Sequence, residues 1–194
     1  MSTVIIQEDC YRRIADVFEA APLEFRRVPV SRPEEMVEEQ RKSGAKVFII
    51  GAERYPRGFY ESIMPDSLVI RYGVGYDHVP VELCKERGIT VGYTPGTLDQ
   101  SVAEHTLALM LACLRDIPRQ DRTVREGQWP HPSGAEMSGK TVAVLGFGRI
   151  GRRVADILKR AFDSQIVALD VFPSPHSQYA SLMDRYTTDF DSAV

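Results

Sequence analysis

Three glycines form the clearest chemical motif in the sequence. Gly146, Gly148 and Gly151 follow a short apolar run in G-x-G-x-x-G register, and the residues after them repeat apolar positions at helical spacing. The first glycine of such a turn permits a tight bend, the second lets a pyrophosphate approach the backbone, and the third lets the helix pack closely on the strand. The free N–H groups and partial positive charge at the helix start then face the phosphates. The motif predicts a dinucleotide site.

An acidic residue follows this motif at an informative distance. Asp170 ends the next predicted strand, Ile166 to Leu169, nineteen positions after Gly151. A carboxylate at that strand end can accept hydrogen bonds from the adenosine ribose hydroxyls and would repel a 2′-phosphate, which favours NAD over NADP. The alternatives are structural: the glycines are plain turns, and Asp170 caps a turn at the strand end.

Short apolar, β-branched runs alternate with helical patterns along the chain and predict the elements that hold this motif. The predicted strands are Val4 to Ile6, Leu23 to Val28, Val47 to Ile50, Leu68 to Ile70, Ile89 to Val91, Val142 to Leu145 and Ile166 to Leu169. Strands that alternate with helices in this way predict parallel sheets covered by helices on both faces. Six of these runs are therefore expected to be buried on both faces, and Leu23 to Val28 is a weaker candidate strand.

A different segment connects the two groups of strands. Ser101 and Glu104 have capping-box spacing, and an almost unbroken apolar stretch runs from Leu107 to Leu114. A helix that is apolar all round is expected to be buried on all sides, as where two domains meet. Pro118 interrupts this helix, and an arginine-rich helix continues to about Gly127.

Composition and charge narrow the function classes. The 194 residues carry a formal net charge of −3, so the chain has no basic footprint for nucleic acid. No apolar run approaches the ~18 residues of a membrane span, and the N-terminus does not resemble a secretory signal, so we expect a cytoplasmic protein. Cys10, Cys84 and Cys113 are odd in number and far apart, which argues against disulfides and a metal site.

Four segments resemble, in order and spacing, the D-isomer-specific 2-hydroxyacid dehydrogenases, which include glyoxylate/hydroxypyruvate reductases and phosphoglycerate dehydrogenases. They are RYGVGYDHVPVELCKERGITVGYTPG, SVAEHTLALML, REGQW and GKTVAVLGFGRIG. The resemblance implies an α/β protein with a flavodoxin-like, parallel-sheet substrate domain over residues 1–100. An inter-domain helix and arm would follow over residues 101–138, and the first half of a Rossmann NAD-binding domain over residues 139–194.

The activity implied by the resemblance is hydride transfer between NAD and C2 of a small 2-oxo or D-2-hydroxy acid. The phrase VGYTPG favours the glyoxylate/hydroxypyruvate branch, and the loop Ala52 to Arg57 would help to build the substrate pocket. A homodimer is implied through the dinucleotide side and the arm around Arg119 to Trp129.

The resemblance also assigns individual residues. Val74 and Gly75 would hold the substrate carboxylate with backbone N–H groups, and Arg71 either adds positive charge there or forms a surface ion pair. The implied cofactor residues are Gly146, Gly148, Arg149, Ile150, Gly151 and Asp170. His78 stands where many members have Asn, and we expect it to be structural.

No catalytic residue is expected within this chain. The family's arginine, glutamate and histidine come from later loops, and His176 and Arg185 fall toward the adenosine end instead. Glu104 is explained by capping and His105 by packing. We therefore expect no dehydrogenase turnover from the 194 residues, which would be the N-terminal part of a longer chain. The alternatives are a non-catalytic relative that binds NAD and recruits partners as corepressors do, or a structural fragment with an exposed sheet edge.

Overall fold

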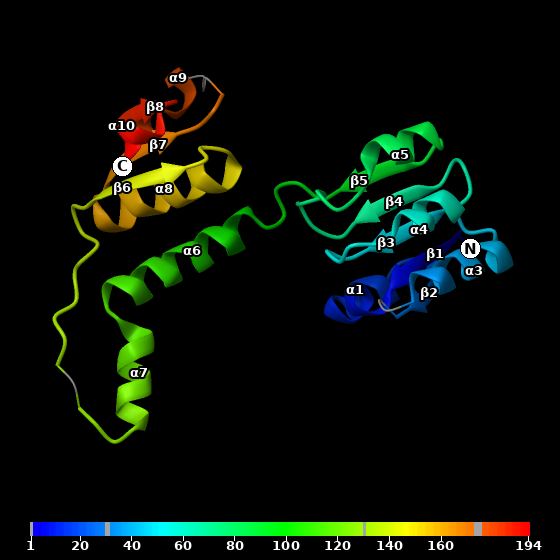
Figure 1. Ribbon diagram of the computed structural model, residues 1–194, viewed down its shortest axis with the longest axis horizontal. Coiled ribbons are helices and arrows are strands. Elements are labelled where there is room, and N and C mark those ends of the chain that lie inside the picture. The colour runs from blue at the N-terminus through cyan, green and yellow to red at the C-terminus, as the bar shows by residue number, and fades with distance from the viewer. Residues whose placement is uncertain (1, 30–31, 130, 173–175) are drawn as a thin grey trace. The chain divides into compact units, whose positions relative to one another are not determined.

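The computed structural model describes residues 2–29, 32–129, 131–172 and 176–194. Internal contacts divide the chain into an N-terminal unit, Met1–Thr97, and a C-terminal unit, Leu98–Val194 (Figure 1). Each unit has its own parallel sheet and apolar core. None of the helices within the described ranges combines the length and the apolar character that crossing a bilayer requires.

The N-terminal unit contains five parallel strands in the order β2-β1-β3-β4-β5. They are β1 (Ser2–Gln7), β2 (Leu23–Val28), β3 (Val47–Ile50), β4 (Leu68–Arg71) and β5 (Thr90–Tyr93). The helices are α1 (Glu8–Arg13), α2 (Ala15–Glu19), α3 (Pro33–Ser43), α4 (Arg57–Ser62) and α5 (Val81–Glu86). This strand order is that of the flavodoxin-like fold and confirms the predicted class.

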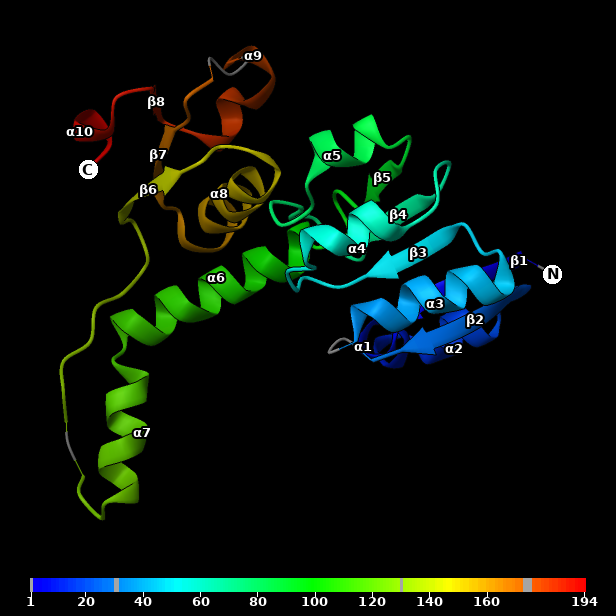
Figure 2. The ribbon, with the colours of Figure 1, turned by 45° about the vertical axis from the view of Figure 1, so that its right-hand side comes forward.

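Helices cover both faces of this sheet. Ile5 lies in one core cluster with side chains of α3, α4 and α5, and the next residue, Ile6, lies in another with Cys10 and Tyr11 of α1. Figure 2 shows the same division, with α3 and α4 on one side of the strands and α1 and α2 on the other. Because adjacent side chains of a strand point to opposite faces, the apolar runs of β1 and β3 fill two cores at once.

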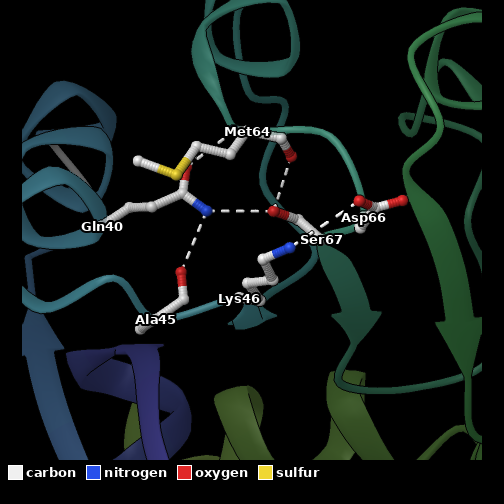
Figure 3. A network of polar contacts seen from close by, with 6 residues as sticks. All are labelled: Gln40, Ala45, Lys46, Met64, Asp66 and Ser67. Atoms are coloured by element: carbon white, nitrogen blue, oxygen red, sulfur yellow. Dashed lines mark hydrogen bonds and ion pairs between the residues drawn. The ribbon is translucent and has the colours of Figure 1, made fainter.

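A buried amide joins α3 to the loops that precede β3 and β4 (Figure 3). Gln40 is fully buried, and its Nε2 donates to the Ala45 carbonyl oxygen at 3.0 Å and to Ser67 Oγ at 2.9 Å. Its Oε1 accepts the Met64 N–H at 2.8 Å. All polar hydrogens of this amide are therefore paired, as burial requires.

The C-terminal unit contains three parallel strands in the order β6-β7-β8. They are β6 (Thr141–Leu145), β7 (Gln165–Leu169) and β8 (Arg185–Thr187). The helices are α6 (Asp99–Leu114), α7 (Ile117–Arg125), α8 (Arg149–Phe162), α9 (His176–Tyr179), the 3₁₀ turn η1 (Ala180–Leu182) and α10 (Phe190–Ala193). Strand succession and order match the first half of a Rossmann fold, as predicted.

Helix α6 differs from its prediction in two ways. It begins at Asp99, so Ser101 lies inside the helix, and Glu104 accepts a hydrogen bond from Gln100 Nε2 at 2.6 Å instead of capping. Among its residues, all of them described, only Ala103 and Leu107 are buried, while Leu109 is 54% exposed. The expectation of burial on all sides is thus wrong for the single chain, because only one side of α6 packs on α8.

Strand β6 also departs from the expected burial. It forms an edge of the described sheet, and its last residue, Leu145, is 55% exposed. An edge strand lacks a neighbour on one side, so its apolar side chains are covered less than those of β7.

The predicted division of the chain into a substrate domain, an inter-domain segment and an NAD-binding part, with boundaries at residues 100 and 138, stays a prediction.

Candidate cofactor and substrate sites

The glycine-rich loop connects β6 to α8. Gly146 has a φ of +93°, a conformation that glycine adopts without the penalty of a side chain. Gly148 is the N-cap residue of α8, and no atom lies within 4 Å of the position that a Cβ would take there. The backbone at the start of α8 is therefore open to a ligand.

Gly151 has the opposite environment. A Cβ at this position would overlap the Gly146 carbonyl oxygen and would lie 3.1 Å from Cγ1 of Val144. The first turn of α8 thus packs directly on the loop and on β6. The second and third glycines of the motif occupy the two environments that the motif predicts, one open and one tightly packed.

Asp170 borders this loop although it is distant in sequence. Its Oδ2 accepts the Phe147 N–H at 2.9 Å, and its Oδ1 accepts the Phe172 N–H at 3.3 Å. The side chain is half-buried at the carboxyl end of β7. An open backbone at a helix start with a carboxylate beside it fits the adenosine and diphosphate parts of a dinucleotide.

Arg149 and Ile150 occupy the first turn of α8 but face different surroundings. Arg149 Nε donates to Asp99 Oδ2 at 2.8 Å, which ties α8 to the start of α6. Ile150 is half-buried and packs on the core of the C-terminal unit. Arg153 Nε adds a second link by donating to Gln100 Oε1 at 2.5 Å. The Arg149–Asp99 ion pair had no signal in the sequence.

The predicted carboxylate loop follows β4. Gly73 has a φ of +134°, and a Cβ there would overlap the Arg71 guanidinium. Arg71 Nη1 donates to the Tyr72 carbonyl oxygen at 2.5 Å, and Arg71 forms no ion pair with a described residue. The guanidinium therefore lies against the loop that contains Val74 and Gly75, and the part of Arg71 in substrate binding stays a prediction.

A pocket of about 170 Å³ adjoins this loop. It is lined by residues 51–53 after β3, by Arg71, and by residues 75–79, which include His78. The lining comes from the carboxyl ends of two neighbouring parallel strands, where ligands of such sheets bind. The pocket belongs entirely to the N-terminal unit.

Gln7 contacts the pocket residue Gly51, and the sequence did not predict a role for it. It is buried at the end of β1, and its Oε1 accepts the Gly51 N–H at 2.6 Å and the Tyr55 hydroxyl at 3.1 Å. Its Nε2 has no partner among the described residues. Burial, reinforced by the charge of Glu53, raises the pKa of the neighbouring Cys10 thiol to about 11.

Metal ligation has no support in the described ranges. No group of three or more His, Cys, Asp or Glu side chains there could hold an ion. Cys10 and Cys84 are buried as free thiols and Cys113 is exposed.

The fold and the loop define an α/β protein with a dinucleotide-binding unit, and comparisons show which known proteins it resembles. Residues 107–193 match the model of the D-isomer specific 2-hydroxyacid dehydrogenase, NAD binding domain. D-3-phosphoglycerate dehydrogenase from Mycobacterium tuberculosis is 46% identical over 111 residues, 56% of this chain and 21% of that protein. Hydroxypyruvate reductase from Thermotoga maritima is 44% identical over 108 residues, 54% of this chain and 34% of that protein.

A solved structure extends the likeness over both units. The 2-hydroxyacid dehydrogenase from Ketogulonicigenium vulgare has a TM-score of 0.76 and 28% identity, over 100% of this chain and 61% of that chain. The matched C-terminal part is similar to the NAD-binding domain of the D-isomer-specific 2-hydroxyacid dehydrogenases, the curated relatives support that family, and NAD is the cofactor of the matched domain. The matches span about a fifth and a third of these two curated relatives.

Proposed function

We propose that this chain supplies the substrate-binding and NAD-binding parts of an NAD-dependent oxidoreductase that acts on a D-2-hydroxy acid or its 2-oxo form. The observation that carries the proposal is the Asp170 carboxylate held at the glycine-rich loop by the Phe147 N–H. The family supports 2-hydroxyacid dehydrogenase chemistry at the general level.

The cofactor would be held by the C-terminal unit. The loop and first turn that include Gly146, Gly148 and Gly151 would present backbone N–H groups to the diphosphate, with the partial positive charge of the α8 N-terminus behind them. Asp170 would accept hydrogen bonds from the ribose hydroxyls and repel a 2′-phosphate. Arg149 and Ile150 would flank the diphosphate. When bound, the nicotinamide ring gives or accepts a hydride at C4.

The substrate would be held by the N-terminal unit. Val74 and Gly75 would donate their backbone N–H groups to the substrate carboxylate, because a loop at the end of a parallel strand offers such donors to an anion. The Arg71 guanidinium, which lies against Gly73, would add positive charge beside that carboxylate.

The polypeptide of residues 1–194 would bind NAD without turnover. This rests on the resemblance, which assigns none of the family's arginine, glutamate and histidine, the residues that polarise and protonate the substrate carbonyl, to a position of this sequence. We place it in the cytoplasm, since its free cysteines suit a reducing compartment. Its net charge of −3 gives no support for nucleic acid as a partner.

A homodimer through the C-terminal unit is part of the same proposal. Large apolar side chains of α6, α7 and the segment after α7 are exposed in the single chain: Leu109, Ile117, Val124 and Trp129. Several large exposed apolar side chains on neighbouring segments favour association of two copies of the chain. Sedimentation velocity of the purified chain, with Trp129→Ser as the interface variant, tests this part, and a concentration-independent monomer would contradict it.

Two measurements test the central proposal. Calorimetric titration should show NAD binding at least about tenfold tighter than NADP binding, equivalent to about 1.4 kcal/mol. Absorbance at 340 nm should show no oxidation of NADH with glyoxylate or hydroxypyruvate. Absence of NAD binding would overturn the cofactor assignment, and measurable turnover would overturn the assignment of an inactive polypeptide.

A further inference from the structure

We propose that Glu53 determines the substrate class at the pocket beside Val74 and Gly75, by rejecting acids that carry a second anionic group and accepting those with a neutral hydroxyl or no substituent. The inference rests on the proposed function, because it assumes that the substrate carboxylate binds at this loop. It distinguishes between the two kinds of substrate that the names of the relatives imply, one phosphorylated and one not.

The charges around the pocket are the first support. Its lining residues, all of them described, include two carboxylates, Glu53 and Asp77, and a single guanidinium, Arg71. Asp77 already lies close to the loop, since a Cβ on Gly75 would be 3.5 Å from its Oδ2. Once the substrate carboxylate is bound beside Arg71, the His78 imidazole is the one basic side chain left on the described lining, against two carboxylates. A phosphate here would meet more negative than positive side chains.

The position of Glu53 is the second support. A Cβ on Gly51 would overlap both the Glu53 carboxylate and the Gln7 amide oxygen, so the acid lies back over the glycine, toward the end of β1. Burial is the main cause of the raised pKa values of Cys10 and Tyr55, and the negative charge of Glu53 adds to both. The carboxylate therefore lies near the carboxyl ends of β1 and β3, and Glu53 is part of the pocket lining.

The size of the pocket agrees with a small acid. A volume of about 170 Å³ equals the liquid volume of roughly five to six water molecules, at about 30 Å³ for each. Under the proposal, a three-carbon acid would bind here with its carboxylate at the loop and its C3 hydroxyl toward Glu53. A hydroxyl can donate a hydrogen bond to a carboxylate, whereas a phosphate can offer only repulsion between like charges.

D-Glycerate and D-3-phosphoglycerate are the probes that test this inference, because they differ only in the phosphate. Each is titrated into the ¹⁵N-labelled 194-residue chain in the presence of NAD, and the backbone amide shifts of Val74 and Gly75 are followed by NMR. We expect D-glycerate to bind at least about tenfold more tightly than D-3-phosphoglycerate, a difference of about 1.4 kcal/mol. The readout needs no catalytic turnover.

Glu53→Gln is the decisive variant, since it keeps the size and removes the charge. We expect it to raise the affinity for D-3-phosphoglycerate about tenfold and to change that for D-glycerate less than about threefold. Glu19→Gln at the exposed end of α2 is the matched control, because it removes the same charge outside the pocket and should change neither affinity.

The outcomes separate this inference from the function on which it rests. Equal affinity for the two acids, or a Glu53→Gln variant that binds D-3-phosphoglycerate no better than the parent, would overturn the role of Glu53 while the carboxylate site stands. If neither acid shifts the Val74 and Gly75 amides, the carboxylate site itself is wrong and the inference falls with it. Equal effects of Glu53→Gln and Glu19→Gln would reduce the role of Glu53 to net charge.

Discussion

The Asp170 carboxylate accepts the Phe147 N–H at 2.9 Å, so the acid that ends β7 is fixed to the loop that follows β6. Two segments 23 positions apart in the chain thereby form one surface. The hydrogen bond orients Oδ2 toward the loop and leaves Oδ1 with the long 3.3 Å bond from Phe172. One carboxylate can thus both hold the loop and meet a sugar hydroxyl.

Asp170→Asn should weaken NAD binding about tenfold or more. It should also reduce the ratio of the affinity for NAD to the affinity for NADP. The variant retains an oxygen acceptor but loses the charge, and hydrogen bonds to a charged group are worth about 1.5–3 kcal/mol. Calorimetry with each cofactor measures both effects. Asp191→Asn in α10, an exposed acid away from the loop, is the control. An unchanged ratio of the two affinities would remove the selective role of Asp170.

Gly151→Ala should lower the stability of the fold, and Gly148→Ala should lower the affinity for NAD. The added methyl at Gly151 meets the Gly146 carbonyl oxygen, and such overpacking should cost about 1–3 kcal/mol of stability, seen as a lower Tm by circular dichroism. At Gly148 the position is open, so stability should change by less than about 0.5 kcal/mol. NAD affinity should nevertheless fall, because the methyl occupies the approach to the backbone. If both variants lost stability equally, the assignment of the two roles would be wrong.

Gln40→Leu should destabilise the N-terminal unit by about 2–4 kcal/mol. The substitution leaves the Met64 N–H, the Ala45 carbonyl and the Ser67 hydroxyl short of a buried partner, and each such group costs about 1–3 kcal/mol. Hydrogen exchange of the β3 and β4 amides reports this unit alone. Lys46→Ala, which removes only the exposed 3.7 Å ion pair to Asp66 in the same region, should cost less than about 0.5 kcal/mol.

Stability should fall between about pH 9 and 11 because of Cys10. Its pKa is raised from 9.0 to about 11 in the folded chain, chiefly by burial, so the unfolded chain loses the thiol proton first. The folded state then binds more protons than the unfolded state, and the free energy of unfolding decreases as pH rises through this window. Two pKa units correspond to about 2.7 kcal/mol at most.

Urea unfolding at pH 8 and pH 11 measures this loss. Cys10→Ala should reduce the pH-dependent part, whereas Cys113→Ala, at an exposed position, should leave it unchanged. The comparison concerns the difference between the two pH values and not the absolute stability, since each substitution also changes packing. Equal pH dependence in all three proteins would exclude Cys10 as its source.

The sequence predicted the sheets well because parallel strands are buried and therefore apolar. The runs Val47 to Ile50 and Val142 to Leu145 differ from β3 and β6 by at most one residue. Strand β8 was missed because its sequence, RYT, is short and carries a charge. Helix α4 was not predicted either, because only a loop, Ala52 to Arg57, was predicted in this part of the chain.

The candidate site was predictable only where a local motif carries it. The glycines of the 146–151 loop and the acid at the end of β7 follow a fixed spacing, and that spacing reflects one strand-helix-strand unit. Arg71 and the loop that contains Glu53 were assigned to the substrate side only through the family resemblance, and Gln7 was not predicted. The three residues lie at the ends of different strands, and the pairing of β1 with β3 and of β3 with β4 brings them together. The composition and periodicity of the sequence do not predict that pairing of strands.

The Gln7 amide oxygen meets the Gly51 N–H, the Tyr55 hydroxyl and the Cys10 thiol at once. A side chain larger than that of glycine at position 51 would displace the Gln7 amide. A shorter side chain at position 7 would leave the three donors without this hydrogen-bond acceptor. Substitutions at positions 7, 10, 51 and 55 are therefore expected to depend on one another during evolution. In an alignment of relatives that share this pocket, they should change as a set, and the amino acid at position 53 should change with them.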